Sequence, residues 1–72
     1  EVLDIVENFV EALGFDLNIY KLDTNNMNYN IDGNQICTFV NKNNPEDRFE
    51  IDISITGKFI IGMSEIHKKE TF

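Results

Sequence analysis

The hydrophobic period of this sequence changes once, at Gly14, and that change determines which elements the chain can form. Before Gly14, apolar residues recur every three or four positions, which is the spacing of a helix with one buried face. After it, apolar and polar residues alternate, which is typical of strands with one buried face. Because a left-handed glycine commonly ends a helix, we predict one helix from Glu1 to Leu13, followed only by strands and turns.

The alternating part divides into four or five strands separated by turn-forming residues. Turns are expected where Asp, Asn and Gly cluster, since these residues adopt the backbone conformations of tight turns. Pro45, the only proline, lies in a polar stretch that we interpret as a loop, because proline has no N–H to give to a sheet. The predicted fold is α+β, with one N-terminal helix packed on the inner face of a four- to five-stranded antiparallel meander. The predicted strands are 15–22, 27–31, 35–41, 49–56 and 59–66, with turns at 23–26, 32–33 and 57–58 and a loop at 41–47.

The chain is short for a self-sufficient fold. Its 72 residues form one domain, 1–72, and a chain of this size buries only roughly 60% of its unfolded surface. The single cysteine, Cys37, cannot form an internal disulfide, which is the usual remedy at this size. We therefore predict that another protein chain contributes to its stability.

Part of the apolar surface is predicted to face that partner. The apolar arc of the helix spans about 160°, whereas covering one surface takes a stripe of roughly 100°. In the last strand, alternation places Ile60 on the outward face, opposite Phe59, Ile61 and Met63. The candidate partner-interface residues are Leu3, Ile5, Phe9 and Ile60.

The helix also allows a second interpretation. Val2, Val6, Phe9 and Leu13 are spaced four, three and four residues apart, as at the core positions of a coiled coil. Two heptads do not distinguish the end of a coiled coil from an ordinary helix that faces its own sheet. Because the sequence starts at Glu1 without a methionine, we expect a fragment of a longer chain, and under the heptad interpretation residues 1–72 would be a C-terminal head that follows a coiled coil.

The charge of the chain limits its partners. Thirteen acidic residues against six basic ones give a formal net charge of -7, which repels nucleic-acid backbones and anionic membranes. The lone thiol, the lack of an Asn-x-Ser/Thr site and the lack of a long apolar run favour a reducing compartment, the cytosol or nucleus. We expect a protein partner, with no nucleic acid and no membrane.

No motif in the sequence carries chemistry. Cys37 and the only imidazole, His67, lie far apart along the chain and supply two of the four ligands of a structural zinc site. Residues 28–33 repeat part of a calcium-loop spacing, but a phenylalanine stands where that loop needs a bidentate glutamate. Glu50 and Asp52 share one strand face and are interpreted as solvated charges. We expect no catalytic residue, metal or cofactor, and no enzyme activity.

Two features carry a resemblance to a known family. The stretch 39–53 reads FVNKNNPEDRFEIDI, in which a strand leads into Asn-Pro-Glu and then into a strand that opens with Phe49. The helix breaks at Leu13-Gly14 just before Phe15. In these respects residues 5–66 resemble the globular head domains of the Spc twenty-five family of kinetochore proteins, although other RWD-like kinetochore or monopolin heads remain alternatives.

The resemblance implies an RWD-like fold at the end of a coiled coil in the outer-kinetochore Ndc eighty complex. It implies a non-catalytic scaffold in the nucleus that pairs with a sister subunit of the Spc twenty-four type. The pair would dock on inner-kinetochore peptide motifs and so help connect spindle microtubules to the centromere in mitosis and chromosome segregation. The alternative function is a stand-alone adaptor that binds an extended peptide at a sheet edge.

Overall fold

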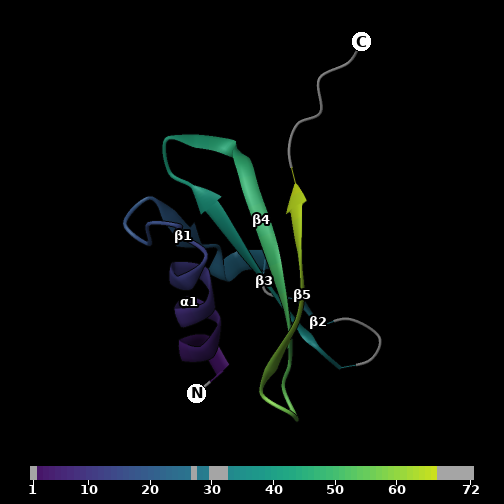
Figure 1. The fold of residues 1–72 in the computed structure, drawn as a ribbon. Coiled ribbons are helices and arrows are strands. Elements are labelled where there is room, and N and C mark those ends of the chain that lie inside the picture. Colours follow the sequence, from purple (N-terminus) through teal and green to yellow (C-terminus); the bar gives the residue numbers. More distant parts are fainter. Residues whose placement is uncertain (1, 27, 30–32, 67–72) are drawn as a thin grey trace.

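The protein folds as one helix packed on an antiparallel sheet, which confirms the predicted α+β class (Figure 1). The computed structural model describes residues 2–26, 28–29 and 33–66. The elements, in chain order, are α1 (Val2–Ala12), β1 (Tyr20–Leu22), the short 3-10 helix η1 (Thr24–Asn26), β2 (Asn28–Tyr29), β3 (Gln35–Asn41), β4 (Asn44–Ser54) and β5 (Phe59–Ile66).

Helix α1 ends as its sequence predicts. Gly14 has a φ of 101°, a left-handed conformation that a residue with a side chain rarely adopts. Its N–H donates to the carbonyl of Glu11 at 2.9 Å, and the next N–H, from Phe15, donates to the carbonyl of Val10 at 3.3 Å. These two bonds form a Schellman motif, which satisfies carbonyls at the end of the helix. Phe15 and Val10 also belong to the same packed cluster, so the chain leaves the helix directly over the core.

The predicted strand 15–22 is wrong over most of its length, because only Tyr20–Leu22 is extended. The cause is Asp16, whose carboxylate accepts a hydrogen bond from the N–H of Asn18 at 2.8 Å. The carbonyl of Asp16 accepts from the N–H groups of Ile19 and Tyr20, both at 2.9 Å. An Asx turn therefore replaces the first part of the strand.

Five strands occupy only four positions across the sheet, in the order β1-β3-β4-β5. β1 and β2 both pair with the same strand, β3, with η1 between them in the chain. β1 pairs with the end of β3, where Tyr20 is opposite Asn41, and β2 pairs with its beginning, where Tyr29 is opposite Gln35. The predicted meander is thus confirmed, and the turn predicted at 23–26 interrupts a single strand position. The expected strand 27–31 is described only at 28–29, since residues 27 and 30–31 lie outside the described part.

The loop predicted at 41–47 is also wrong, because β4 already begins at Asn44 and runs through Pro45. The turn itself consists of residues 42–43. The register explains why proline is tolerated: Val40 is opposite Arg48, whereas the next residue, Asn41, is opposite Asn44. Residues 45–47 therefore have no partner on β3, and the N–H that proline lacks would not have entered that ladder.

The hairpin between β4 and β5 contains a second irregularity. Ile53 is opposite Ile60, but Asp52 is opposite Gly62, so Ile61 is an extra residue on β5. This bulge reverses the predicted alternation. Ile60 and Met63 both pack against the core, whereas the side chains of Phe59 and Ile61 are 58% and 47% exposed. The expectation that Ile60 faces outward, opposite the other three, is therefore wrong. The turn predicted at 57–58 is confirmed within the turn at 55–58.

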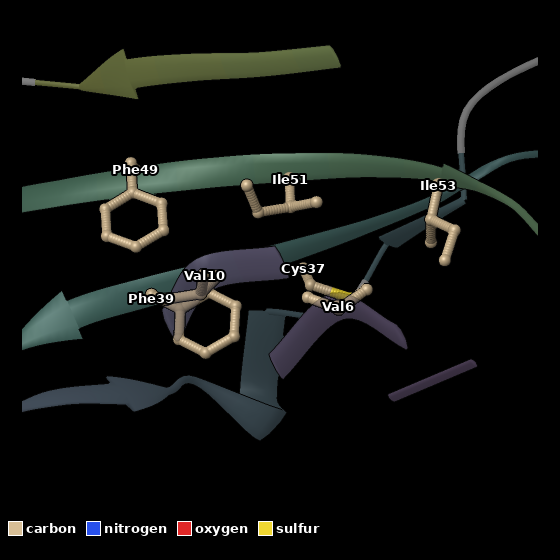
Figure 2. Packing of buried hydrophobic residues seen from close by; sticks show 7 residues of the cluster. All are labelled: Val6, Val10, Cys37, Phe39, Phe49, Ile51 and Ile53. Atoms are coloured by element: carbon tan, nitrogen blue, oxygen red, sulfur yellow. The ribbon is translucent and has the colours of Figure 1, made fainter. Parts of the chain in front are cut away.

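The core lies between α1 and the central strands β3 and β4. Figure 2 shows side chains of β3 and β4 directed toward those of the helix. The rings of Phe39 and Phe49 stack there, with centroids 5.4 Å apart. The fully buried apolar residues are Val6, Val10, Cys37, Phe39, Phe49, Ile51 and Ile53. Because the core is this small, much of the apolar surface of α1 and β5 is only half-buried or exposed.

Candidate protein-binding surfaces

The outer flanks of α1 form the first candidate surface. Only Val6 and Val10 of this helix are fully buried. Leu3, Ile5 and Phe9 pack against the core but remain half-buried. Leu13, just beyond the helix, is 48% exposed. We call the surface made by Leu3, Ile5, Phe9 and Leu13 the helix surface. Its apolar arc is wider than the strip that the sheet covers completely, and its binding to a partner remains a prediction.

Ile60, the fourth candidate interface residue, lies elsewhere. It lies on β5, half-buried against the core opposite Ile53, and so does not face outward as expected. The exposed apolar side chains of β5 are instead Phe59 and Ile61, which the sequence reasoning did not select. The available signal was Gly62, since a glycine inside a strand often marks a bulge.

The outer edge of β5 forms the second candidate surface. β5 pairs with β4 along one side, and among the described residues no strand pairs with its other side. An edge of eight residues presents a row of backbone N–H and C=O groups to another chain. We call this surface, with the side chains of Phe59 and Ile61, the β5 edge.

The sheet face opposite the helix carries carboxylates next to this edge. Glu50 and Asp52 alternate with the core residues of β4, which places them on that face, and each is half-buried. Asp52 has one carboxylate oxygen, Oδ1, that is buried and has no hydrogen-bond partner. Buried polar atoms are normally paired, so this one requires an explanation.

A third cluster lies around residues 45–47, which are not opposite any residue of β3, and side chains satisfy it internally. The hydroxyl of Tyr20 donates to Oδ2 of Asp47 at 2.6 Å, and the Asn41 amide donates to the same oxygen at 3.1 Å. The Tyr20 ring contacts that of Phe15 edge-on, with centroids 4.9 Å apart. The hydrogen bond to Asp47, with burial and the negative charge adding to it, raises the pKa of Tyr20. This hydroxyl therefore stays protonated at neutral pH and acts as a structural donor rather than a base.

The structure describes only some of the other residues that the sequence singled out for chemistry. Cys37 is completely buried, and burial raises the pKa of its thiol, so the reactive thiolate is disfavoured. His67 lies outside the described residues, as do Asn30 and Asp32 of the partial calcium spacing. Within residues 2–26, 28–29 and 33–66, no group of His, Cys, Asp or Glu has the arrangement of a metal site. Over the same residues, no helix has the length and hydropathy needed to cross a membrane.

Comparison of the chain with models of known protein families, with curated proteins and with solved structures found no match.

Proposed function

We propose that this domain is a non-catalytic scaffold that forms a heterodimer with a sister head domain at the outer kinetochore, in the nucleus. The observation that carries the proposal is the apolar surface of α1 that its own sheet does not cover. Leu3, Ile5 and Phe9 are each half-buried rather than buried, and Leu13 is nearly half exposed. The resemblance of residues 39–53 and of the Leu13-Gly14 break to Spc twenty-five heads supplies the kinetochore context.

Energetics support a partner on this surface. Burying apolar area stabilises by about 25 cal/mol per Å², and the core offers only a few fully buried side chains. A domain of this size has a narrow stability margin. A sister chain that covered the helix surface would add apolar burial where the isolated domain has little, and it would stabilise the folded state by mass action.

Co-expression with a sister head domain of the Spc twenty-four type tests the proposal. Sedimentation should show a one-to-one complex, and the melting temperature should rise by at least about 5 °C over that of the isolated chain. Leu13→Glu should weaken the complex, because it places a charge on the exposed end of the helix surface. Asn8→Glu is the matched control, since it adds the same charge at an exposed position of α1 outside the helix surface.

A monomer whose sedimentation and melting temperature do not change on addition of the sister domain would contradict the proposal. Equal weakening by Leu13→Glu and Asn8→Glu would show that charge alone, rather than the helix surface, governs association.

The open β5 edge favours a second function, the capture of an extended peptide by strand addition. Among the described residues the outer side of β5 has no strand partner, and its backbone groups are available to one. Amide hydrogen exchange distinguishes this function from helix pairing. An added peptide strand should slow exchange along 59–66 and leave exchange in α1 unchanged, whereas a sister chain on the helix surface should leave the β5 edge unchanged.

A further inference from the structure

Gly62 is a glycine without a local reason for being one. Its φ lies outside the left-handed region, so its backbone conformation does not require glycine. A Cβ atom built on it would have no heavy atom within 4 Å, so packing does not require glycine either. A glycine inside a strand lowers stability and often marks a bulge or a place where another backbone or a ligand approaches closely. Gly62 adjoins the bulge at Ile61, but its φ there is one that other residues also adopt. Its position in the open edge strand therefore favours an approach from outside.

The residue opposite Gly62 is Asp52, whose Oδ1 is buried without a partner. Asp52 lies on the sheet face away from the helix, between Ile36 of β3 and Gly62 of β5. On the β5 side, Gly62 itself therefore places no side chain between the Asp52 carboxylate and the open edge, and the position of its missing Cβ is open space. A side chain from a strand added to that edge would meet no side chain at Gly62.

We propose that the β5 edge binds an extended segment of another protein that carries a lysine or arginine, and that this basic side chain crosses Gly62 to pair with Asp52. The inference deepens the strand-addition function and does not depend on the pairing of the helix surface. An added strand would lie about 10 Å from β4, two strand spacings away. The long side chains of lysine and arginine extend over such distances, and arginine forms two hydrogen bonds to a carboxylate.

Charge supports this occupant. The chain has a formal net charge of -7, and Glu50 lies on the same strand face two residues from Asp52. A basic segment is therefore attracted both by the net charge of the whole domain and by the carboxylates of Glu50 and Asp52. A second copy of this chain fits less well, because β5 contains no lysine or arginine and two copies repel each other. The exposed side chains of Phe59 and Ile61 would give apolar contacts beside the charged pair.

Binding of designed peptides to the chain tests the inference. The probe is an eight-residue peptide of alternating threonine and valine with one central arginine, compared with the same peptide in which glutamine replaces arginine. Isothermal titration should give a preference for the arginine peptide of about tenfold, as expected for a charged hydrogen-bonded pair. Nuclear magnetic resonance shifts should map both peptides to 59–66.

Three variants separate the charge from the fold. Asp52→Asn keeps the shape of the side chain and should abolish the preference for arginine. Gly62→Val should also abolish the preference for arginine, because the valine side chain would occupy the space beside Asp52 that the arginine crosses. Valine is favoured in strands, so the variant should fold. Glu50→Gln is the matched control, because it removes one charge from the same face of β4, and it should retain most of the preference. Circular dichroism of each variant establishes that it is folded.

Two results would overturn the inference, and they differ in whether the strand-addition function also fails. If both peptides bind at β5 with equal affinity, or if folded Asp52→Asn keeps the preference for arginine, the strand-addition function stands. The proposed pairing of a basic side chain with Asp52 is then wrong. If neither peptide shifts the resonances of β5, both the strand-addition function and the proposed pairing with Asp52 fail. The proposal of a heterodimer through the helix surface is unaffected by that result.

Discussion

The β3–β4 and β4–β5 hairpins each contain one irregularity, and the two differ in whether side chains of the described residues satisfy it. At the β3–β4 end, residues 45–47 are not opposite any residue of β3, but the hydrogen bonds of Asp47 with Tyr20 and Asn41 hold this segment in place. In the β4–β5 hairpin, the bulge leaves Ile61 exposed and Asp52 with an unpaired oxygen. Side chains of the fold satisfy the first irregularity, whereas the second retains an exposed apolar side chain and an unpaired carboxylate oxygen.

The contrast extends to the aromatic rings at the two ends. Phe49 lies among three other rings, with centroid distances of 4.4 Å to Phe15, 5.5 Å to Tyr20 and 5.4 Å to Phe39. Phe59, at the start of β5, is 58% exposed, and its ring lies over the backbone of Gly57 in the turn. A ring packed on all sides stabilises the fold, whereas an exposed ring beside an open edge is available to a partner.

The largest expected effect comes from exchanging these two rings for alanine. Phe49→Ala should lower the free energy of unfolding by about 3–5 kcal/mol, because it removes a buried ring and leaves a cavity. That is a large part of the stability of so small a domain. Phe59→Ala should change it by about 0.5 kcal/mol or less. Urea denaturation followed by circular dichroism measures both. Similar losses in the two variants would show that the β5 end is packed as firmly as the core.

The next largest effect concerns the two carboxylates. Asp47→Ala should destabilise by about 1–3 kcal/mol, because the half-buried donors of Tyr20 and Asn41 lose their acceptor. Asp52→Ala should be nearly neutral or slightly stabilising, since it removes a buried acceptor that has no donor. The same urea titrations measure this pair. A loss at Asp52 as large as that at Asp47 would mean that Asp52 is satisfied within the fold, and the contrast would disappear.

A smaller effect should appear at alkaline pH at the closed end. The hydrogen bond to Asp47 raises the pKa of Tyr20 above its usual 10.0, so the protonated hydroxyl is favoured in the folded state. Its contribution to stability is complete below about pH 10 and declines as pH rises from there through the raised pKa. Burial raises the pKa of Cys37 as well, which adds a loss of the same sign above its usual 9.0.

Tyr20→Phe isolates the tyrosine contribution, because Cys37 is unchanged in that variant. Between pH 9 and 11 the stability of the wild-type chain should fall more steeply than that of Tyr20→Phe in urea titrations. Parallel curves for the two proteins would mean that the contact between Tyr20 and Asp47 does not form in solution.

The elements that could be predicted from the sequence are those determined by local pattern. The end of α1 at Gly14 and the bounds of β3 follow from residues within one or two turns of each other, and both are confirmed. The turn at Asp16 was also local, with Asn18 two residues on, but the alternation of Phe15 and Leu17 concealed it. A local pattern therefore misleads when a turn happens to bury alternate side chains.

The irregularities could not be predicted because they depend on the register between strands. Nothing near Pro45 indicates that β3 would shift by three residues against β4, and Gly62 suggests a bulge in β5 without indicating that Ile61 would be the extra residue. The bulge moved Ile60 into the core and exposed its two neighbours. The outward orientation expected of Ile60 was therefore wrong, whereas the helix candidates have the half-buried positions that their broad apolar arc indicated.

The smallest expected effect tests whether the fold itself has any use for Gly62. Because a Cβ atom there meets no neighbour and the backbone is not left-handed, Gly62→Ala should raise the free energy of unfolding by about 0.5–1 kcal/mol. Gly57→Ala is the control, since its Cβ would overlap the ring of Phe59 and must displace it, which should remove any such gain. Urea titration resolves the two. If Gly62→Ala destabilises the chain, the fold requires that glycine, and the open space beside Asp52 is a consequence of folding rather than a place kept for a partner.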